Sequence, residues 1–101
     1  MEFIVKIHDS EHGRLVSVCD KKLHGKKFED ENREVDLSKE FYNGKEKSED
    51  ELLAILRTAY MINLVGNDCV KIAVDSGLVD SENVIEIQGI KHAQALVIRE
   101  V

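Results

Sequence analysis

Apolar and polar residues alternate at the start of the chain, in the pattern typical of a half-buried β-strand. Phe3, Val5 and Ile7 share one side, and most of the residues between them are polar. This alternation predicts a strand that ends in a polar turn containing a glycine. Residues 14–19 predict the return strand, so we expect a β-hairpin over residues 2–19.

A helical period replaces the alternation in the middle of the chain. Ser48 followed by Glu51 forms a capping-box pattern, in which each side chain bonds the backbone N–H of the other residue. Apolar residues then recur at helical spacing along one face. The Asn-Asp pair at 67–68 can begin a second apolar stripe, which ends at a glycine suited to a helix C-terminus. We therefore predict two helices within residues 48–77, joined by an elbow at residues 63–66.

Shorter apolar stretches complete the predicted elements. Residues 34–37, 84–87 and 96–101 are predicted strands, and residues 89–93 are a connection between the last two. We predict an α+β fold, with an antiparallel twisted sheet of about five strands and two helices packed on one face. The final strand is expected beside the N-terminal hairpin, and residues 1–101 are expected to form a single compact domain.

The composition fits a globular protein in which 101 residues are 43% hydrophobic. No apolar run approaches the roughly 18 residues of a membrane-spanning helix, so no membrane association is expected. The start of the chain lacks a signal-peptide pattern. The two cysteines, Cys19 and Cys69, form neither a CxxC pair nor a disulfide framework. We therefore expect a cytoplasmic protein.

The charge limits the nucleic-acid partners to consider. A net charge of −6 argues against a protein that coats nucleic acid, although residues 1–27 carry six Lys/Arg against four Asp/Glu. The second predicted helix presents Asp68, Lys71 and Asp75, whereas a DNA-reading helix presents basic or amide side chains. Sequence-specific DNA binding is therefore not expected.

A basic loop is the one stretch suited to phosphate. It comprises Lys21, Lys22, His24, Lys26 and Lys27, arranged around Gly25. Such lysines position a nucleic acid without reading its sequence. The alternative is a solvated loop that balances the acidic residues after it, and the residues alone favour that alternative.

Aromatic residues and histidines offer further candidate contacts. Phe41 and Tyr42 stack bases if exposed, with Tyr42 the better candidate for exposure, or they anchor the loop in the core. His8 and His12 bracket acidic residues, and Cys19 is a third possible ligand for zinc. Zinc binding needs about four ligands, and an H-x-x-x-H pair in a turn is more often surface-exposed, so no metal is expected.

Two other places have the side chains of a reactive or binding site. Cys19 next to Asp20 suggests a nucleophile, but the neighbouring carboxylate raises the thiol pKa, and a buried structural cysteine is favoured. The connection that begins at Gly89 carries His92 and Gln94, together with a lysine, where turns usually carry Asp, Asn or Ser. These side chains bind an anion or a base edge, or they satisfy backbone groups; the two interpretations are equally supported.

Six short motifs follow one another along the chain: Val18-Cys19-Asp20, Leu23-x-Gly25-Lys26-x-Phe28, Phe41-Tyr42-x-Gly44, Asn63-Leu64-Val65-Gly66, Gly77-Leu78-Val79 and Gly89-Ile90-x-His92-Ala93-Gln94. Together they resemble the small archaeal proteins of domain-of-unknown-function family 424, over essentially the whole chain. The family pattern has a proline just before the His-Ala-Gln block, where this chain has Lys91. This departure replaces a rigid residue with a charge.

The resemblance implies no established activity, but it implies RNA binding and association with the translation machinery. Carried over position by position, it marks Cys19, Asp20, Gly25, Lys26, Asn63, Gly66, Gly89, His92 and Gln94. The leading hypothesis is a non-enzymatic RNA- or ribonucleoprotein-binding module linked to translation. In this hypothesis, backbone phosphate is engaged by Lys21, Lys22, Lys26 and Lys27, while His92 and Gln94 make the selective contacts.

Two alternatives belong to other functional classes. One is a small enzyme that acts on an anionic substrate through a pocket of Cys19, Asp20 and His92, with Asn63, Gly66 and Gly89 nearby. The other is a protein-interaction domain that docks through its acidic first helix. No cofactor is expected in any of the three, and the residues leave the oligomeric state open.

Overall fold

The chain begins with a long antiparallel hairpin. In the computed structural model, which describes residues 2–97, β1 (Glu2–Ser10) pairs along its length with β2 (Gly13–Asp20). The hairpin predicted at residues 2–19 is therefore confirmed. The remaining elements are η1 (Lys21–Leu23), β3 (Lys27–Glu29), β4 (Glu34–Asp36), η2 (Glu40–Tyr42), β5 (Lys45–Ser48), α1 (Glu49–Leu56), β6 (Met61–Val65), α2 (Asn67–Asp75), η3 (Ser81–Asn83), β7 (Ile85–Ile87) and β8 (Ile90–Leu96), where η denotes a 3₁₀ helix.

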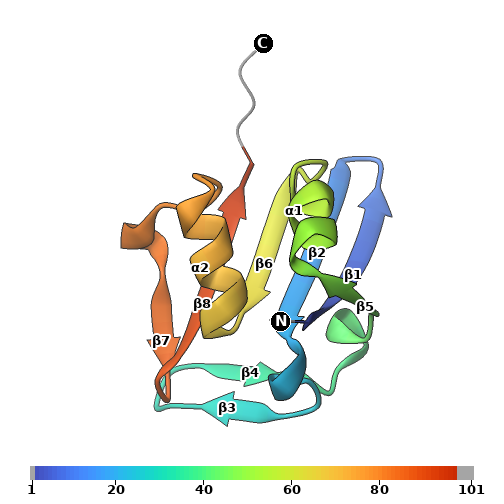
Figure 1. Ribbon diagram of the computed structural model, residues 1–101. Helices are drawn as coiled ribbons and strands as arrows, with labels where there is room; N and C mark the ends of the chain where they lie inside the picture. Colours follow the sequence, from blue (N-terminus) through green and yellow to red (C-terminus); the bar gives the residue numbers. More distant parts are fainter. Residues whose placement is uncertain (1, 98–101) are drawn as a thin grey trace.

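Six strands form the main sheet in the order β5-β1-β2-β6-β8-β7 (Figure 1). Every neighbouring pair is antiparallel except β2 and β6, which run parallel. Strands β3 and β4 form a separate two-stranded sheet. The fold is thus α+β with two helices and a mostly antiparallel sheet, as expected, but the sheet has six strands where about five were predicted.

The last strand of the described chain lies where a connection was predicted. Strand β8 occupies residues 90–96, most of which were expected to be a connection, and residues 98–101 of the predicted final strand lie outside the described part of the chain. Strand β6 lies between β8 and the N-terminal hairpin, so β8 does not pair with that hairpin. Between β7 and β8, Gln88 and Gly89 both have positive φ, at 53° and 77°. A two-residue loop of this kind forms a tight hairpin turn.

The predicted helical elbow at residues 63–66 is wrong. Helix α1 ends at Leu56, and Met61–Val65 is the strand β6 in the middle of the sheet. Four consecutive residues of β6, from Ile62 to Val65, are buried. A strand covered on both faces gives a continuous apolar run instead of an alternation. In β6 the polar Asn63 stands between apolar residues without a regular alternation, and the spacing of those apolar residues is compatible with a helical stripe as well, so periodicity alone could not separate the two.

The start of α1 and the end of α2 follow the sequence signals, whereas α2 has Gly66 as its N-cap instead of Asn67 or Asp68. At α1, the Ser48 hydroxyl accepts from the Glu51 N–H at 3.3 Å, and the Glu51 carboxylate accepts from the Ser48 N–H at 3.0 Å. At α2, Gly77 adopts a φ of 75°, and the Leu78 N–H donates to the Ala73 carbonyl at 2.9 Å. This is the Schellman motif, in which a left-handed glycine ends a helix. Within residues 2–97, neither helix is long and apolar enough to cross a membrane.

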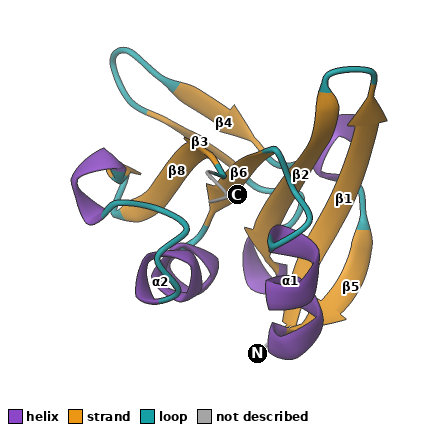
Figure 2. Ribbon diagram, turned by 90° about the horizontal axis from the view of Figure 1, so that it is seen from above, coloured by secondary structure: helices purple, strands orange, loops and turns teal. Residues whose placement is uncertain are grey.

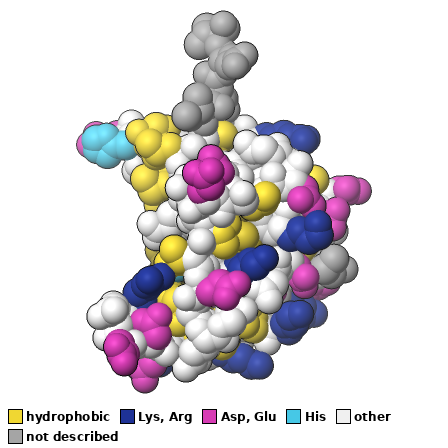
Figure 3. Space-filling model, turned by 90° about the vertical axis from the view of Figure 1, so that its left-hand side faces the viewer, with side chains coloured by type: hydrophobic (Ala, Val, Ile, Leu, Met, Phe, Trp, Pro, Cys, Tyr) yellow, Lys and Arg dark blue, Asp and Glu magenta, His cyan; other side chains and the backbone are white. Residues whose placement is uncertain are grey.

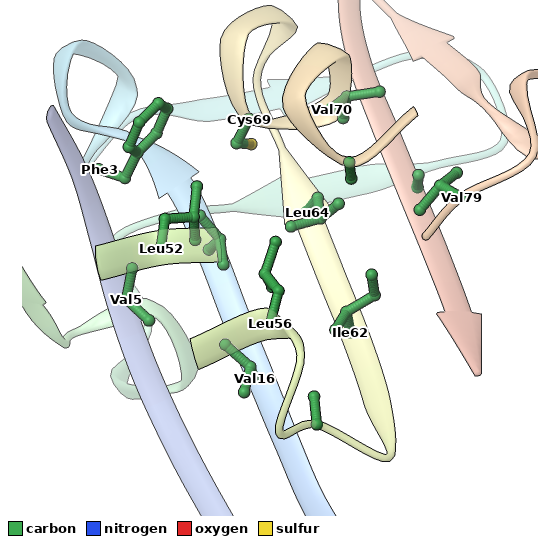
Figure 4. Close-up of a cluster of buried hydrophobic side chains, with 14 residues drawn as sticks. Phe3, Val5, Val16, Leu52, Leu56, Ile62, Leu64, Cys69, Val70 and Val79 are labelled. Carbon is green, nitrogen blue, oxygen red and sulfur yellow. The ribbon is translucent and has the colours of Figure 1, made fainter. Parts of the chain in front are cut away.

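One surface of the central strands packs into the main hydrophobic core, and we call it the apolar face. Side chains of both helices and of four strands meet there (Figure 4). The buried members are Phe3, Val5, Val16, Val18, Leu52, Leu56, Ala59, Ile62, Leu64, Cys69, Val70, Ala73, Val79 and Ala93. At about 25 cal/mol per Å² of apolar surface removed from water, this core is the main source of stability.

The opposite surface, which we call the mixed face, carries polar and apolar side chains on the same strands. Successive residues of a strand point to opposite sides, so Leu64 belongs to the apolar face and Asn63 and Val65 to the mixed face. Residues 21–44, the covering segment, pass over part of this face with the β3–β4 pair (Figure 2). The second core cluster consists of Cys19, Leu23, Val35, Leu37, Tyr42, Val65 and Ile87.

Candidate functional site

Asp20 is a structural residue that begins helix α2. Its side chain is 2% exposed, and its carboxylate accepts from the Asp68 N–H at 3.0 Å and the Cys69 N–H at 2.9 Å. The first backbone N–H groups of a helix have no partner within the helix, and Asp20 supplies one from a strand far away in sequence. Gly66 makes this approach possible: it has a φ of 132°, and a Cβ there would overlap the Asp20 carboxyl group. The motif positions Asp20 and Gly66 are thereby explained by the packing of β2 against α2.

Both cysteines are buried thiols. Burial, aided by the charge of Asp20, raises the pKa of Cys19 to about 12. Burial also raises the pKa of Cys69, and its Sγ contacts the Gly66 carbonyl at 3.5 Å. Since the thiolate is the reactive form, neither cysteine is prepared for nucleophilic attack. The prediction of structural, buried cysteines is confirmed.

The structure does not bring Cys19, Asp20 and His92 together. In the register of the sheet, Cys19 lies opposite Val65, and Val65 lies opposite His92. Cys19 and His92 are therefore two strands apart, about 10 Å at the usual strand spacing. Asp20, the next residue along β2, is directed to α2. The pocket required by the enzyme alternative is not formed.

His92 and Gln94 instead meet at a buried amide. Asn63, 3% exposed, accepts through its Oδ1 from the His92 Nε2 at 3.1 Å and from the Gln94 Nε2 at 2.8 Å. Its Nδ2 donates to the Tyr42 hydroxyl oxygen at 2.6 Å. Because Oδ1 only accepts, the proton of the neutral His92 ring must be on Nε2. Asn63 thus holds one imidazole and one amide in a fixed relation, and we call these four residues together with Arg33 the His92 site.

Arg33 is the member of the His92 site that sequence reasoning missed. It lies in the turn between β3 and β4, and its charge, after burial, is the second cause that lowers the pKa of His92. The Nδ1 atom of His92 is buried and has no hydrogen-bond partner within residues 2–97. In the sequence, Arg33 stands out only as a single arginine within an acidic turn. That pattern does not indicate that it lies near His92 in the fold. The site therefore has a neutral imidazole near a cation.

Gln94 and Arg33 are the exposed residues of the His92 site. One N–H of the Gln94 amide is used by Asn63, and within residues 2–97 its Oε1 and its other N–H have no hydrogen-bond partner and can meet a ligand. The His92 ring is half-buried beside it. Gly89, in contrast, serves the turn into β8 and does not line this site.

The basic loop is less positive than its sequence suggests. Three of its lysines contact carboxylates: Lys21 with Glu46 at 2.6 Å, Lys22 with Asp68 at 3.6 Å and Lys27 with Glu34 at 3.5 Å. Within residues 2–97, Lys26 has no ion pair. Figure 3 likewise shows acidic and basic side chains interspersed on the side of the molecule that carries β7. The loop lysines are exposed but largely balanced.

The expected exposure of Tyr42 over Phe41 is wrong. Tyr42 is 9% exposed because its hydroxyl reaches Asn63 under the covering segment, whereas Phe41 is 37% exposed. Phe41 stacks on His8 with the ring centroids 4.7 Å apart, and the His8 Nε2 lies 3.1 Å from the Phe41 carbonyl oxygen. His12 is in the exposed β1–β2 turn beside Glu11. Across residues 2–97, no group of three or more His, Cys, Asp and Glu residues is placed to hold a metal ion, so the zinc hypothesis finds no ligand set there.

Comparison with known proteins identifies the family of this chain. A family model described as "Protein of unknown function (DUF424)" matches residues 7–98. The chain belongs to the DUF424 family. The resemblance drawn from the six motifs is thereby confirmed, and a search of curated proteins finds no match to this DUF424 protein.

A solved structure supports the fold of this DUF424 protein. The chain is similar to the crystal structure of an uncharacterized conserved protein from Methanopyrus kandleri, with a TM-score of 0.81 and 24% sequence identity. The match covers 100% of this chain and 96% of the other. At this identity the likeness shows the fold alone.

Proposed function

We propose that this DUF424 protein is a non-catalytic module that binds RNA or a ribonucleoprotein linked to translation. The observation that carries the proposal is the fixed pair of His92 and Gln94, held by Asn63 beside the Arg33 cation. Single-stranded RNA is recognised by ring stacking and by hydrogen bonds to base edges. A half-buried imidazole suits the first contact, and the free atoms of the Gln94 amide suit the second.

The cations of the covering segment would supply the phosphate contacts. Within residues 2–97, Lys26 and Arg33 have no ion pair, and the other three loop lysines contact carboxylates that are exposed or, for Asp68, partly exposed. Exposed ion pairs of this kind contribute about 0–1 kcal/mol each. A phosphate can therefore replace the carboxylate partner of Lys21, Lys22 or Lys27 at a modest free-energy cost.

The arrangement of the reactive side chains favours binding over catalysis. Both thiols are buried and protonated, and Asp20 is occupied by the N-terminus of α2. Within residues 2–97, the hydrogen-bond partner of the His92 ring is the Asn63 amide, which is not a nucleophile that a general base could activate. A binding module needs only the preorganised contacts that the His92 site has.

Crosslinking of the tagged protein to RNA in its native cells, followed by sequencing, tests the proposal. We expect enrichment of ribosomal or transfer RNA. Replacing Lys21, Lys22, Lys26 and Lys27 by alanine should lower recovery of all bound RNAs, and in vitro it should reduce the salt dependence of affinity by about one unit of slope per lost phosphate contact. Gln94→Ala should instead change which sequences are recovered.

Lys71→Ala is the matched control, because Lys71 lies on α2 and pairs with Asp75 away from the covering segment. RNA recovery at the level of an untagged strain would overturn the proposal, as would full recovery by the fourfold lysine variant. Either result would favour a protein-interaction domain, for which the exposed acidic first turn of α1 is one docking surface.

A further inference from the structure

Strand β1 extends beyond its neighbour at the edge of the sheet. β5 pairs with β1 only from Glu2 to Val5, whereas β1 continues to Ser10 (Figure 1). In the described part of the chain, residues 6–10 therefore have β2 on one side and no strand on the other. Such an edge presents unpaired backbone N–H and C=O groups, which can pair with another chain.

A groove lies along this free edge, and its lining is both apolar and basic. It is lined by Val5, Lys6, Ile7, Asn43, Gly44, Lys45, Lys47 and Ile55. Ile7 is 41% exposed, which is high for an isoleucine in a long strand. The lining contains three lysines and no acidic residue, although the whole chain has a net charge of −6. The acidic composition of the whole chain does not predict this local excess of positive charge.

The lysines of the groove are available to an incoming anion. Within residues 2–97, Lys45 has no ion pair. Lys6 contacts Glu40 at 2.7 Å and Lys47 contacts Glu51 at 3.9 Å, and the two glutamate side chains are 79% and 56% exposed. Both carboxylates lie outside the lining, and exposed pairs are weak. A carboxylate that enters the groove can compete for Lys6 and Lys47.

We propose that an extended acidic segment of a partner protein binds here as an added strand next to β1, in line with β5. Side chains of an added strand alternate between the two surfaces of the sheet. On one surface they would contact Ile7 and Ile55 between Lys45 and Lys47, and on the other they would meet Lys6. Backbone hydrogen bonds would supply affinity, and alternating acidic and apolar residues would supply specificity.

Other occupants fit the groove less well. An RNA backbone would use the lysines, but it would leave the strand edge unpaired and the exposed Ile7 without an apolar partner. A second copy of this chain, paired through its own β1 edge, would bring two sets of groove lysines together, and like charges at a shared edge oppose association. The acidic peptide is therefore the occupant whose chemistry matches all three features of the groove.

Binding of a fluorescein-labelled ten-residue peptide that alternates Glu and Val tests this inference by fluorescence anisotropy. A peptide with Lys in place of Glu is the control ligand. The expected result is binding of the acidic peptide alone, at least tenfold weaker to the Lys45→Glu/Lys47→Glu variant and unchanged in Lys71→Glu. Lys45→Gln/Lys47→Gln, with an expected intermediate loss, replaces the double glutamate variant if that protein does not fold.

Amide hydrogen exchange of the complex distinguishes strand addition from simple charge attraction. Slower exchange within residues 6–10 upon addition of the acidic peptide is expected, since an added strand protects that edge. The inference is overturned if exchange there is unchanged, or if both peptides bind equally. It is also overturned if a single-stranded oligouridine displaces the peptide and Ile7→Asp has no effect on either ligand. The loop lysines lie outside the groove, so this inference and the RNA proposal fail independently.

Discussion

The two faces of the central sheet are built from the same strands but from different chemistry. On the apolar face, Val16, Ile62 and Leu64 pack in a cluster of apolar side chains, at whose end Asp20 caps α2. On the mixed face, their neighbours Ser17 and Asn63 are equally buried and are satisfied by hydrogen bonds under the covering segment. Apolar packing needs only shape, whereas a buried amide needs partners at defined positions.

This difference in chemistry gives the two faces different roles: the apolar face stabilises the fold, and the mixed face carries groups for binding. The buried side chains of the apolar face contact one another, so in the described part of the chain they leave no polar group for a ligand. The mixed face ends in groups that are fixed but not fully used: Gln94 has free amide atoms, and the His92 Nδ1 has no partner within residues 2–97. We therefore expect substitutions on the apolar face to lower stability most, and substitutions on the mixed face to lower it less while changing binding.

Leu64→Ala is expected to have the largest effect. Leu64 is fully buried in the middle of the core, so its truncation removes apolar contacts and leaves a cavity. The free energy of unfolding should fall by about 2–5 kcal/mol. Urea denaturation monitored by circular dichroism measures the loss, with exposed Leu96→Ala as the control. A loss below that of the mixed-face variants would contradict the division between the faces.

Asp20→Ala should follow, because it leaves one buried and one partly buried N–H group at the start of α2 without a partner. We expect a loss of about 2–3 kcal/mol of unfolding free energy. Asp20→Asn keeps one side-chain acceptor and should show about half of that loss. The same denaturation measurement checks both variants. Equal stability of the alanine and asparagine variants would show that the cap is not the origin of the effect.

The Asn63 cluster should contribute less. Asn63→Leu preserves volume but leaves the Tyr42 hydroxyl and the His92 Nε2 without their partner, so a loss of about 1–2 kcal/mol is expected. Tyr42→Phe should lose about 0.5–1 kcal/mol. A double-mutant cycle should give a coupling energy of at least about 0.5 kcal/mol, and additive losses would show that the hydrogen bond is not formed.

The pH dependence from His92 is expected to be the smallest effect. Burial and the Arg33 charge lower the pKa of folded His92 below its ordinary value of 6.5. The unfolded chain therefore binds more protons as the pH falls below about 6.5, and stability decreases until the lowered pKa is passed. Comparison of urea denaturation between pH 7.5 and 5 with that of His92→Gln isolates this contribution. Parallel curves for the two proteins would contradict it.

Local signals predicted those parts of the fold that depend on neighbouring residues. The hairpin, the capping box at Ser48 and the glycine end of α2 were all found from sequence. The central strand β6 was mistaken for helix, because a strand buried on both faces lacks alternation. The His92 and Gln94 stretch was recognised as unusual, but its partners Asn63 and Arg33 come from other strands and turns.

The sequence alone determined the N-terminal hairpin, the capping box at Ser48 and the glycine that ends α2, because these arise from backbone preferences and from contacts between residues a few positions apart. Only the tertiary structure decided which residues became the middle of the sheet and that Asp20 begins α2. It also decided that Tyr42 is buried while Phe41 is exposed, and that most of the loop lysines have acidic partners. These outcomes depend on groups far apart in the chain, which meet only when the strands and the covering segment pack together.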